Sequence, residues 1–282
     1  MLIDTHCHLN FKAFEGKVEK VIQRAKKSGV KKIIVPGTNL ETSKKAVELA
    51  EKYDGVYATV GIHPHHASQV QSSKFKVQNE LKKLARSKKV VAIGECGLDY
   101  YQYKKTPASA LESPHRLIQP RSDRDALAGK QKQLFIIQIQ LAKKLNLPLI
   151  IHNRQADQNL FEMINGQWSM VNGCLKGVLH CFQGNNQLLN WAIKRHFYIG
   201  ITGIVTYDKK MQEVVRKTPL KNILIETDAP YLMPEPMRRT KKWPNEPKNV
   251  KIVVERIAKI KGDSFLNVTK KTSDNAIKLF KI

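Results

Sequence analysis

Short apolar runs recur along the chain, and polar or turn residues bound each of them. Segments with the 3.6-residue period of an amphipathic helix lie between these runs. The pattern predicts strands at Leu2–Thr5, Lys32–Pro36, Tyr57–Ile62, Val90–Glu95, Pro148–His152, Gly177–Cys181, Phe197–Ile201 and Asn222–Thr227. It predicts helices at Val18–Ser28, Leu40–Tyr53, Val77–Ser87, Gln131–Leu145, Gln158–Gly166, Gln187–Lys194, Met211–Lys217, Val250–Lys261 and Ser273–Leu279.

Strands that alternate with helices indicate parallel pairing, because each crossover between parallel strands needs room for a helix. Eight such strands in 282 residues suit a closed (β/α)8 barrel, the TIM barrel of the α/β class, which typically needs about 250 residues. We therefore expect one domain over residues 1–282.

One segment departs from this pattern. Residues 104–130, KKTPASALESPHRLIQPRSDRDALAGK, contain three prolines and show no clear periodicity. We expect an irregular insertion after the fourth strand, on the face where barrel active sites lie. Two interpretations stay open, a lid or substrate arm and a disordered surface insertion.

The residues at the predicted strand ends carry most of the chemistry. Seven of the nine histidines lie at or just beyond such an end, as in THCH, GIHPHH, IIHNR and VLHCF. Because a barrel builds its active site at the carboxyl ends of its strands, we expect these imidazoles to converge. The residues that we assign to metal ions are His6, His8, Glu95, His152, His180 and Asp228.

These ligands exceed what one ion needs, so the sequence predicts two divalent ions with Glu95 as the bridge. His6, His8, Glu95 and Asp228 are assigned to one ion, and Glu95, His152 and His180 to the other. Imidazole and carboxylate ligands suit Zn, Mn, Fe, Co or Mg. Asp228 is a candidate acceptor of the proton from an attacking water. Glu226, two residues earlier, is either a residue that orients a ligand or a buried salt-bridge partner.

The cysteines are not expected to be ligands. Cys7, Cys96 and Cys181 each follow a candidate ligand directly, so strand alternation turns them toward the helices. With Cys174 they form no CxxC pair, and we expect reduced thiols in a cytoplasmic protein. No basic segment followed by an apolar run begins the chain, and no stretch of 18 apolar residues predicts a membrane span.

Charge adds a candidate partner. The chain has 49 Lys and Arg against 24 Asp and Glu, a formal net charge of +25. Such a field attracts polyanions, and nucleic acid is the first candidate. The alternative is that many lysines are simply solvated on helix faces. No obligate protein partner is predicted.

The stretches DTHCHL, GIHPH, GECGLDYY, PLIIHNR, GVLHCFQG and ETDAPYL, followed by NEPKNV, resemble the TatD family of metal-dependent deoxyribonucleases within the amidohydrolase-like barrels. The match spans nearly the whole chain in the expected order. The resemblance implies a divalent-metal centre with the ligands named above and hydrolysis of DNA phosphodiesters from the 3′ end by metal-bound hydroxide. It also implies that His63 contacts phosphate and assists catalysis beside Glu95 and Asp228, with His65 a weaker candidate.

Substrate contacts are predicted less directly. Arg154, and either Arg238 or Arg239 in the segment MPEPMRRTKKWP, are candidates to hold a phosphate. Tyr100, Tyr101, Phe182 and Tyr231 near the predicted mouth either stack bases or pack loops. Two other functions remain open: hydrolysis of amides or esters, including removal of an amino acid from tRNA, and nucleic-acid binding by a barrel without activity.

Overall fold

The computed structural model describes residues 1–69, 74–101, 121–169, 175–240 and 243–282. Within these residues one sheet of eight parallel strands follows the order of the sequence. The strands are β1 (Leu2–Asp4), β2 (Val30–Pro36), β3 (Val56–Val60), β4 (Val90–Asp99), β5 (Leu149–Arg154), β6 (Gly177–Leu179), β7 (Tyr198–Ile201) and β8 (Ile223–Ile225).

The sheet closes between its first and last strands. The backbone N–H of Thr5 donates to the carbonyl of Ile225 at 3.1 Å, and Cys7 forms a parallel bridge with Ala229. Asp4, fully buried, accepts hydrogen bonds from the backbone N–H and the hydroxyl of Thr227 at 2.9 and 2.6 Å. Hydrogen bonds therefore run around the whole ring, and the predicted (β/α)8 barrel is confirmed.

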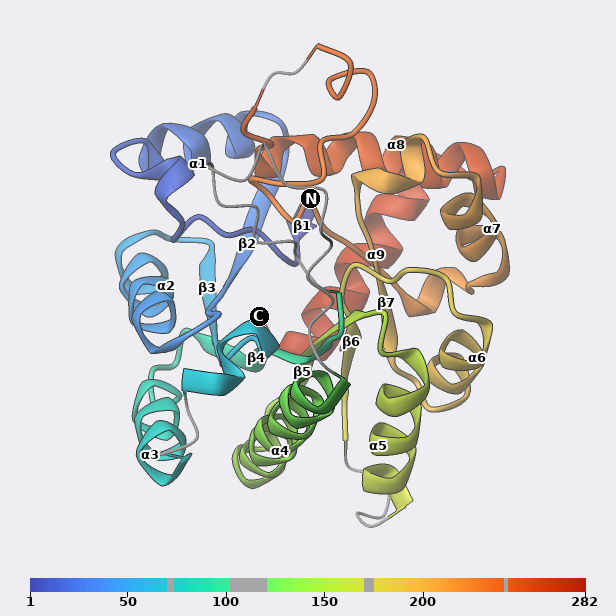
Figure 1. Cartoon of the computed structure of the whole chain (residues 1–282). Helices are drawn as coiled ribbons and strands as arrows, with labels where there is room; N and C mark the ends of the chain where they lie inside the picture. Colours follow the sequence, from blue (N-terminus) through green and yellow to red (C-terminus); the bar gives the residue numbers. More distant parts are fainter. Residues whose placement is uncertain (70–73, 102–120, 170–174, 241–242) are drawn as a thin grey trace, which may run out of the picture.

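Helices surround the strands, as Figure 1 shows. They are α1 (Val18–Lys27), α2 (Leu40–Lys52), α3 (Lys74–Leu84), α4 (Arg121–Leu145), α5 (Asp157–Ser169), α6 (Asn186–Lys194), α7 (Lys209–Lys217), α8 (Val250–Lys261) and α9 (Phe265–Phe280). Short 3-10 helices lie at η1 (Lys12–Phe14), η2 (Pro64–Gln69), η4 (Gly203–Thr206), η5 (Leu220–Asn222) and η6 (Pro247–Asn249). No helix in the described part of the chain is long and apolar enough to cross a membrane.

Side-chain alternation divides the core into two layers. One side chain from most strands enters the barrel interior, among them Ile3, Ile34, Ile150, Val178 and Leu224. Their neighbours along each strand pack outward against the helices. Ala276, Leu279 and Phe280 of α9 join the interior group and close one end of the barrel. The polar site occupies the other end, so the ligands sit on an apolar floor.

Three predicted boundaries need correction. The last helix, predicted at Ser273–Leu279, is α9 and spans Phe265–Phe280. β4 does not end at Glu95 but continues to Asp99, because pairing with β5 extends to Asp99 and Arg154. The predicted insertion at 104–130 is helical from Arg121 onward, since α4 begins there rather than at Gln131. All three prolines of the segment precede Arg121, and the residues after it include good helix formers. The part before it lies outside the described residues.

Candidate metal centre

His6 and His8 follow β1 directly, at the seam where the barrel closes. Their backbone groups are held by the segment after β8: the N–H of Asp228 donates to the carbonyl of His6 at 2.9 Å, and the N–H of His8 donates to that of Ala229 at 2.7 Å. Both imidazoles are buried, and their Nε2 atoms lie 3.2 Å apart. Neighbouring donors with lone pairs aimed together are typical of a metal site.

Four donor atoms gather around one point at this seam. The Nε2 atom of His6 lies 3.4 Å from Oε2 of Glu95 and 3.7 Å from Oδ1 of Asp228. The Nε2 atom of His8 lies 3.7 and 3.3 Å from the same two oxygens. Donors bound tetrahedrally at about 2.1 Å are separated by about 3.4 Å. The residues assigned to the first ion therefore fit a divalent metal closely.

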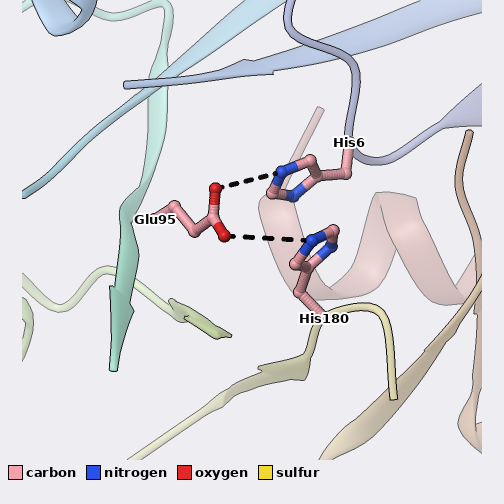
Figure 2. A group of neighbouring side chains, drawn as sticks. All are labelled: His6, Glu95 and His180. Atoms are coloured by element: carbon pink, nitrogen blue, oxygen red, sulfur yellow. Dashed lines mark ion pairs between the residues drawn. The ribbon is translucent and has the colours of Figure 1, made fainter. Parts of the chain in front are cut away.

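Glu95 lies at the centre of the site. Figure 2 shows its two carboxylate oxygens directed toward His6 on one side and His180 on the other. The Oε1 atom lies 2.8 Å from Nδ1 of His152, 3.5 Å from Nε2 of His63 and 3.9 Å from Nε2 of His180. This carboxylate thus faces two groups of donors, as a bridging ligand must.

The second group differs in detail from the expected set of Glu95, His152 and His180. His152 clusters with Glu95 and His63, whereas His180 clusters with Glu95 and His6. The rings of His152 and His180 lie 6.4 Å apart, and His180 stacks on His6 with centroids 3.5 Å apart. The Nε2 atom of His63 therefore lies closer to Oε1 of Glu95, at 3.5 Å, than that of His180 does, at 3.9 Å.

Asp99 is a site residue that sequence reasoning missed. It is 4% exposed at the end of β4, and its Oδ2 atom lies 2.8 Å from Nε2 of His65 and 3.1 Å from Nε2 of His152. The signal was present, because Asp99 lies four residues after Glu95 on the same face of a strand. Asp99 holds His152 from the side opposite Glu95 and fixes the ring between two carboxylates.

Glu226 supports His180 from behind. Its Oε1 atom lies 3.0 Å from Nδ1 of His180 and accepts a hydrogen bond from the N–H of Cys181 at 2.6 Å. Glu226 is 1% exposed, and the room it occupies exists because residue 200 is glycine: an added Cβ there would lie 2.6 Å from its Oε1. Glu226 is thus a buried salt-bridge partner of His180, and its role in orienting this candidate ligand stays a prediction.

The charges of the site are set by competition between burial and neighbours. Burial favours a neutral Glu95, but the imidazoles of His63, His152 and His6 lower its pKa well below the usual value. Burial opposes protonation of His180, yet Glu226 and Asp228 raise its pKa to about 10. Burial lowers the pKa of His63 well below its usual value. The Glu95 carboxylate is thus ionised and ready to bind a cation.

All candidate ligands except the fully buried His6 line a cavity of about 810 Å³ that opens at the carboxyl ends of the strands. Three predicted substrate residues, His63, His65 and Arg154, line it too. The guanidinium of Arg154 stacks on the ring of Tyr101 at 3.7 Å. Tyr231 also lines the cavity, whereas Tyr100 packs against the hydrophobic core.

Arg238 and Arg239 lie outside this cavity, and their assignment as phosphate contacts stays a prediction. Neither lines the cavity. Both pair with Glu235, at 3.8 and 3.5 Å, and Arg238 stacks on Tyr207. An acidic residue one turn away satisfies the two guanidinium groups locally, so they are held on the outside of the loop.

The cysteines follow the prediction in two of three described cases. Cys7 and Cys96 are fully buried in the core between strands and helices. Cys181 instead lines the cavity, because β6 ends at Leu179 and strand alternation no longer applies at its position, where φ is +43°. Burial raises the pKa of its thiol well above the usual value, so it is a neutral wall residue. Cys174 lies outside the described residues.

The support that Glu226 gives to His180 can be tested by substitution. In Glu226→Gln the contact with His180 loses its charge, and we expect metal affinity to fall roughly 10- to 100-fold, as for other residues that orient metal-binding histidines. Metal titration followed by calorimetry measures this change. The matched control is Glu246→Gln, whose side chain pairs with Arg24 outside the cavity; equal losses in the two variants would contradict the assignment.

Comparisons with known proteins agree with this site. The family model described as TatD related DNase matches residues 3–281. The uncharacterized metal-dependent hydrolase YabD of Bacillus subtilis is 38% identical over 284 residues, covering 100% of both chains. The 3′-5′ ssDNA/RNA exonuclease TatD of Pantoea ananatis is 33% identical over 285 residues, covering 99% of both.

A solved structure has the same fold. The TatD homologue YJJV of Escherichia coli superposes with a TM-score of 0.82 at 29% identity, covering 100% of this chain and 98% of the other. The protein is thus a metal-dependent hydrolase that acts on ester bonds, and the chain belongs to the TatD related DNase family.

Proposed function

We propose that the protein is a 3′-5′ exonuclease that hydrolyses phosphodiesters of single-stranded nucleic acid, DNA in particular, with two divalent metal ions. The observation that carries the proposal is Glu95, whose two oxygens face two groups of imidazoles. Relatives about one third identical over the full length bear the name of such an exonuclease. The basic chain, with a formal net charge of +25, attracts a polyanion.

The donor set fits two sites of unequal completeness. His6, His8, Asp228 and Glu95 would hold one ion, and Glu95, His152 and His180 would hold the other, with His63 beside them. Imidazole-rich sites favour Zn, Mn, Fe or Co over Mg. Ions bound there would lower the pKa of water and neutralise charge that develops on the phosphate oxygens.

The protein's own side chains supply the remaining steps. His8 and His180 lower the pKa of Asp228 despite its burial, so its carboxylate is ionised. In that form it would accept the proton that the attacking water loses. The N–H of His65 donates to Nδ1 of His63 at 3.2 Å, which leaves Nε2 of His63 as the protonated atom. The Nε2–H group of His63 would donate to a phosphate oxygen, and the guanidinium of Arg154 would add a charged contact.

Labelled oligonucleotides test the proposal directly. With Mn²⁺, Zn²⁺ or Mg²⁺ added, a 3′-labelled single strand should release its label at once as mononucleotide, while a 5′-labelled strand gives a descending ladder. EDTA should stop both reactions. If metal-loaded protein leaves the strand intact, the proposed nuclease activity is wrong. The same preparation should then be assayed on aminoacyl-tRNA and on nitrophenyl esters. Strand binding that ignores EDTA without any hydrolysis would favour a binding protein.

Arg154 and Arg239 offer a matched pair for the phosphate contact. Arg154→Ala should raise KM for an oligonucleotide about tenfold or more, because a charge-assisted hydrogen bond to the substrate is lost. Arg239→Ala removes an equal charge from a side chain that is 85% exposed and pairs with Glu235, and KM should change little. Steady-state kinetics on one oligonucleotide compares them; a larger effect for Arg239 would restore it as the phosphate contact.

A further inference from the structure

A second cavity lies directly beside the metal centre. It measures about 540 Å³ and lies between η1, the start of α2 and the segment after β8. Phe11 and Tyr231 line both this cavity and the one that holds the candidate ligands. The two cavities therefore adjoin, with these two side chains in the wall of both. We call the second one the aromatic cavity, after Phe11, Tyr231 and Trp243 in its wall.

Its aromatic side chains are unusually open to solvent. Trp243 is 63% exposed and Tyr231 is 50% exposed. Tyr101, across the metal cavity, is 38% exposed, and these three make up half of the large exposed hydrophobic residues in the described part of the chain. An aromatic ring that stays in contact with water does not contribute the free energy that its burial would give. Several such rings around one site therefore indicate a ligand that covers them.

An aromatic path joins the cavity to the ligands. The ring of Phe11 stacks on that of His8 with centroids 4.2 Å apart and planes 19° apart. The rings of Tyr231 and Phe11 lie edge to face, with their centroids 6.4 Å apart. A strand whose phosphodiester lies at the metal centre would therefore meet aromatic surface on leaving it.

The charges of the aromatic cavity nearly cancel. Lys12 and Lys45 line it together with Glu15 and Glu41, and Lys45 pairs with Glu41 at 2.9 Å. Such a wall does not select for a phosphate or for an acidic peptide. It suits a flat, weakly polar group, and a nucleobase next to a bound phosphodiester is such a group.

We propose that the aromatic cavity is a subsite for a nucleobase of the single-stranded substrate, bound by stacking on Trp243 and Tyr231. This proposal rests on the function proposed above. Stacking accepts every base, because each has a π face, so the subsite supports processing of any sequence. It also discriminates against duplex, since a paired base has both faces covered by its neighbours.

Trp243 provides both a variant and a spectroscopic signal. In EDTA, titration of the protein with an oligothymidylate should quench part of the tryptophan fluorescence, and Trp243→Phe should lack that part. The other two tryptophans are Trp168 and Trp191, of which Trp191 is only 6% exposed. Trp243→Ala should weaken binding roughly tenfold, the usual effect of losing one stacked base, and Trp243→Phe should weaken it less.

Kinetics with metal separate this proposal from the proposed function. In Trp243→Ala the ratio of kcat/KM for a ten-nucleotide strand to that for bis(4-nitrophenyl) phosphate should fall about tenfold, because the small ester does not reach the cavity. Leu266→Ala, which removes a 77% exposed apolar side chain from α9, is the control and should keep the wild-type ratio.

The outcomes are distinct. If the wild-type protein cleaves the strand but the Trp243 variants keep the wild-type ratio and quenching, the proposed subsite is wrong. The proposed nuclease activity would then still hold. Quenching and weakened binding without cleavage by any metal form would support the subsite and overturn the nuclease.

Discussion

Glu95→Gln should lower kcat/KM for phosphodiester hydrolysis by about 1,000-fold or more, the largest effect that we expect from a single side chain. Glu95 is 4% exposed and lies within 3.9 Å of His6, His8, His63, His152 and His180. Glutamine keeps the size of the side chain but offers one neutral oxygen instead of two charged ones. The buried imidazoles would then lack the anion that lets cations approach them.

Metal content and kinetics together check this expectation. The variant should bind fewer ions than the wild-type protein by elemental analysis, and added Mn²⁺ or Zn²⁺ should not restore turnover. Circular dichroism should show an unchanged fold, because the barrel core is apolar and lies below the site. A variant with a full complement of metal and wild-type turnover would rule out Glu95 as the bridging ligand.

Gly97→Ala should destabilise the protein by about 4 kcal/mol and should also disorder the site. Residue 97 has a φ of +135°, a backbone conformation that side chains other than glycine rarely adopt. A Cβ added there would overlap the carbonyl oxygen of His152, which pairs with it across β4 and β5. The strands would have to separate beside both Glu95 and His152.

A thermal melt measures the loss, which should lower Tm by roughly 10 °C in a protein of this size. Gly129→Ala is the matched control, because residue 129 lies inside α4 and a Cβ added there meets nothing within 4 Å. That change should raise the free energy of unfolding by about 0.5–1 kcal/mol, the usual gain of alanine over glycine in a helix. Similar melts for both variants would show that the β4–β5 contact tolerates a side chain.

Local patterns in the sequence sufficed for much of the fold. Eight apolar runs alternating with amphipathic helices predict parallel strands, and all eight strands exist in the expected order. Element ends were less predictable, because tertiary pairing sets them: β5 extends β4 to Asp99, and α4 begins after the last proline of the preceding segment. The role of α9 as the closure of the barrel floor could not be predicted, since only its contacts with the strand interiors reveal it.

The metal centre was predictable for a different reason. Barrel topology brings strand ends together, so histidines at those ends must converge wherever the fold is correct. His6, His8, Glu95 and Asp228 therefore followed from strand positions, and Asp99 was open to the same reasoning once β4 was known to be longer. Sequence positions could not predict that His63 groups with His152 and His180 with His6. The orientations of these rings depend on their contacts with Asp99 and Glu226.

The sequence by itself determined the fold class and the kinds of ligand, because hydrophobic period and residue chemistry are local properties. Tertiary structure alone decided which charged side chains reach the cavity. Arg154 and Arg239 are both phosphate candidates in the sequence, yet Arg154 lines the cavity beside Tyr101, whereas Arg239 does not line it and pairs with Glu235. Trp243 lies far from every strand in the sequence. It lines the aromatic cavity because the segment after β8 folds back over η1 and α2. Such placements depend on partners distant along the chain, which no local pattern encodes.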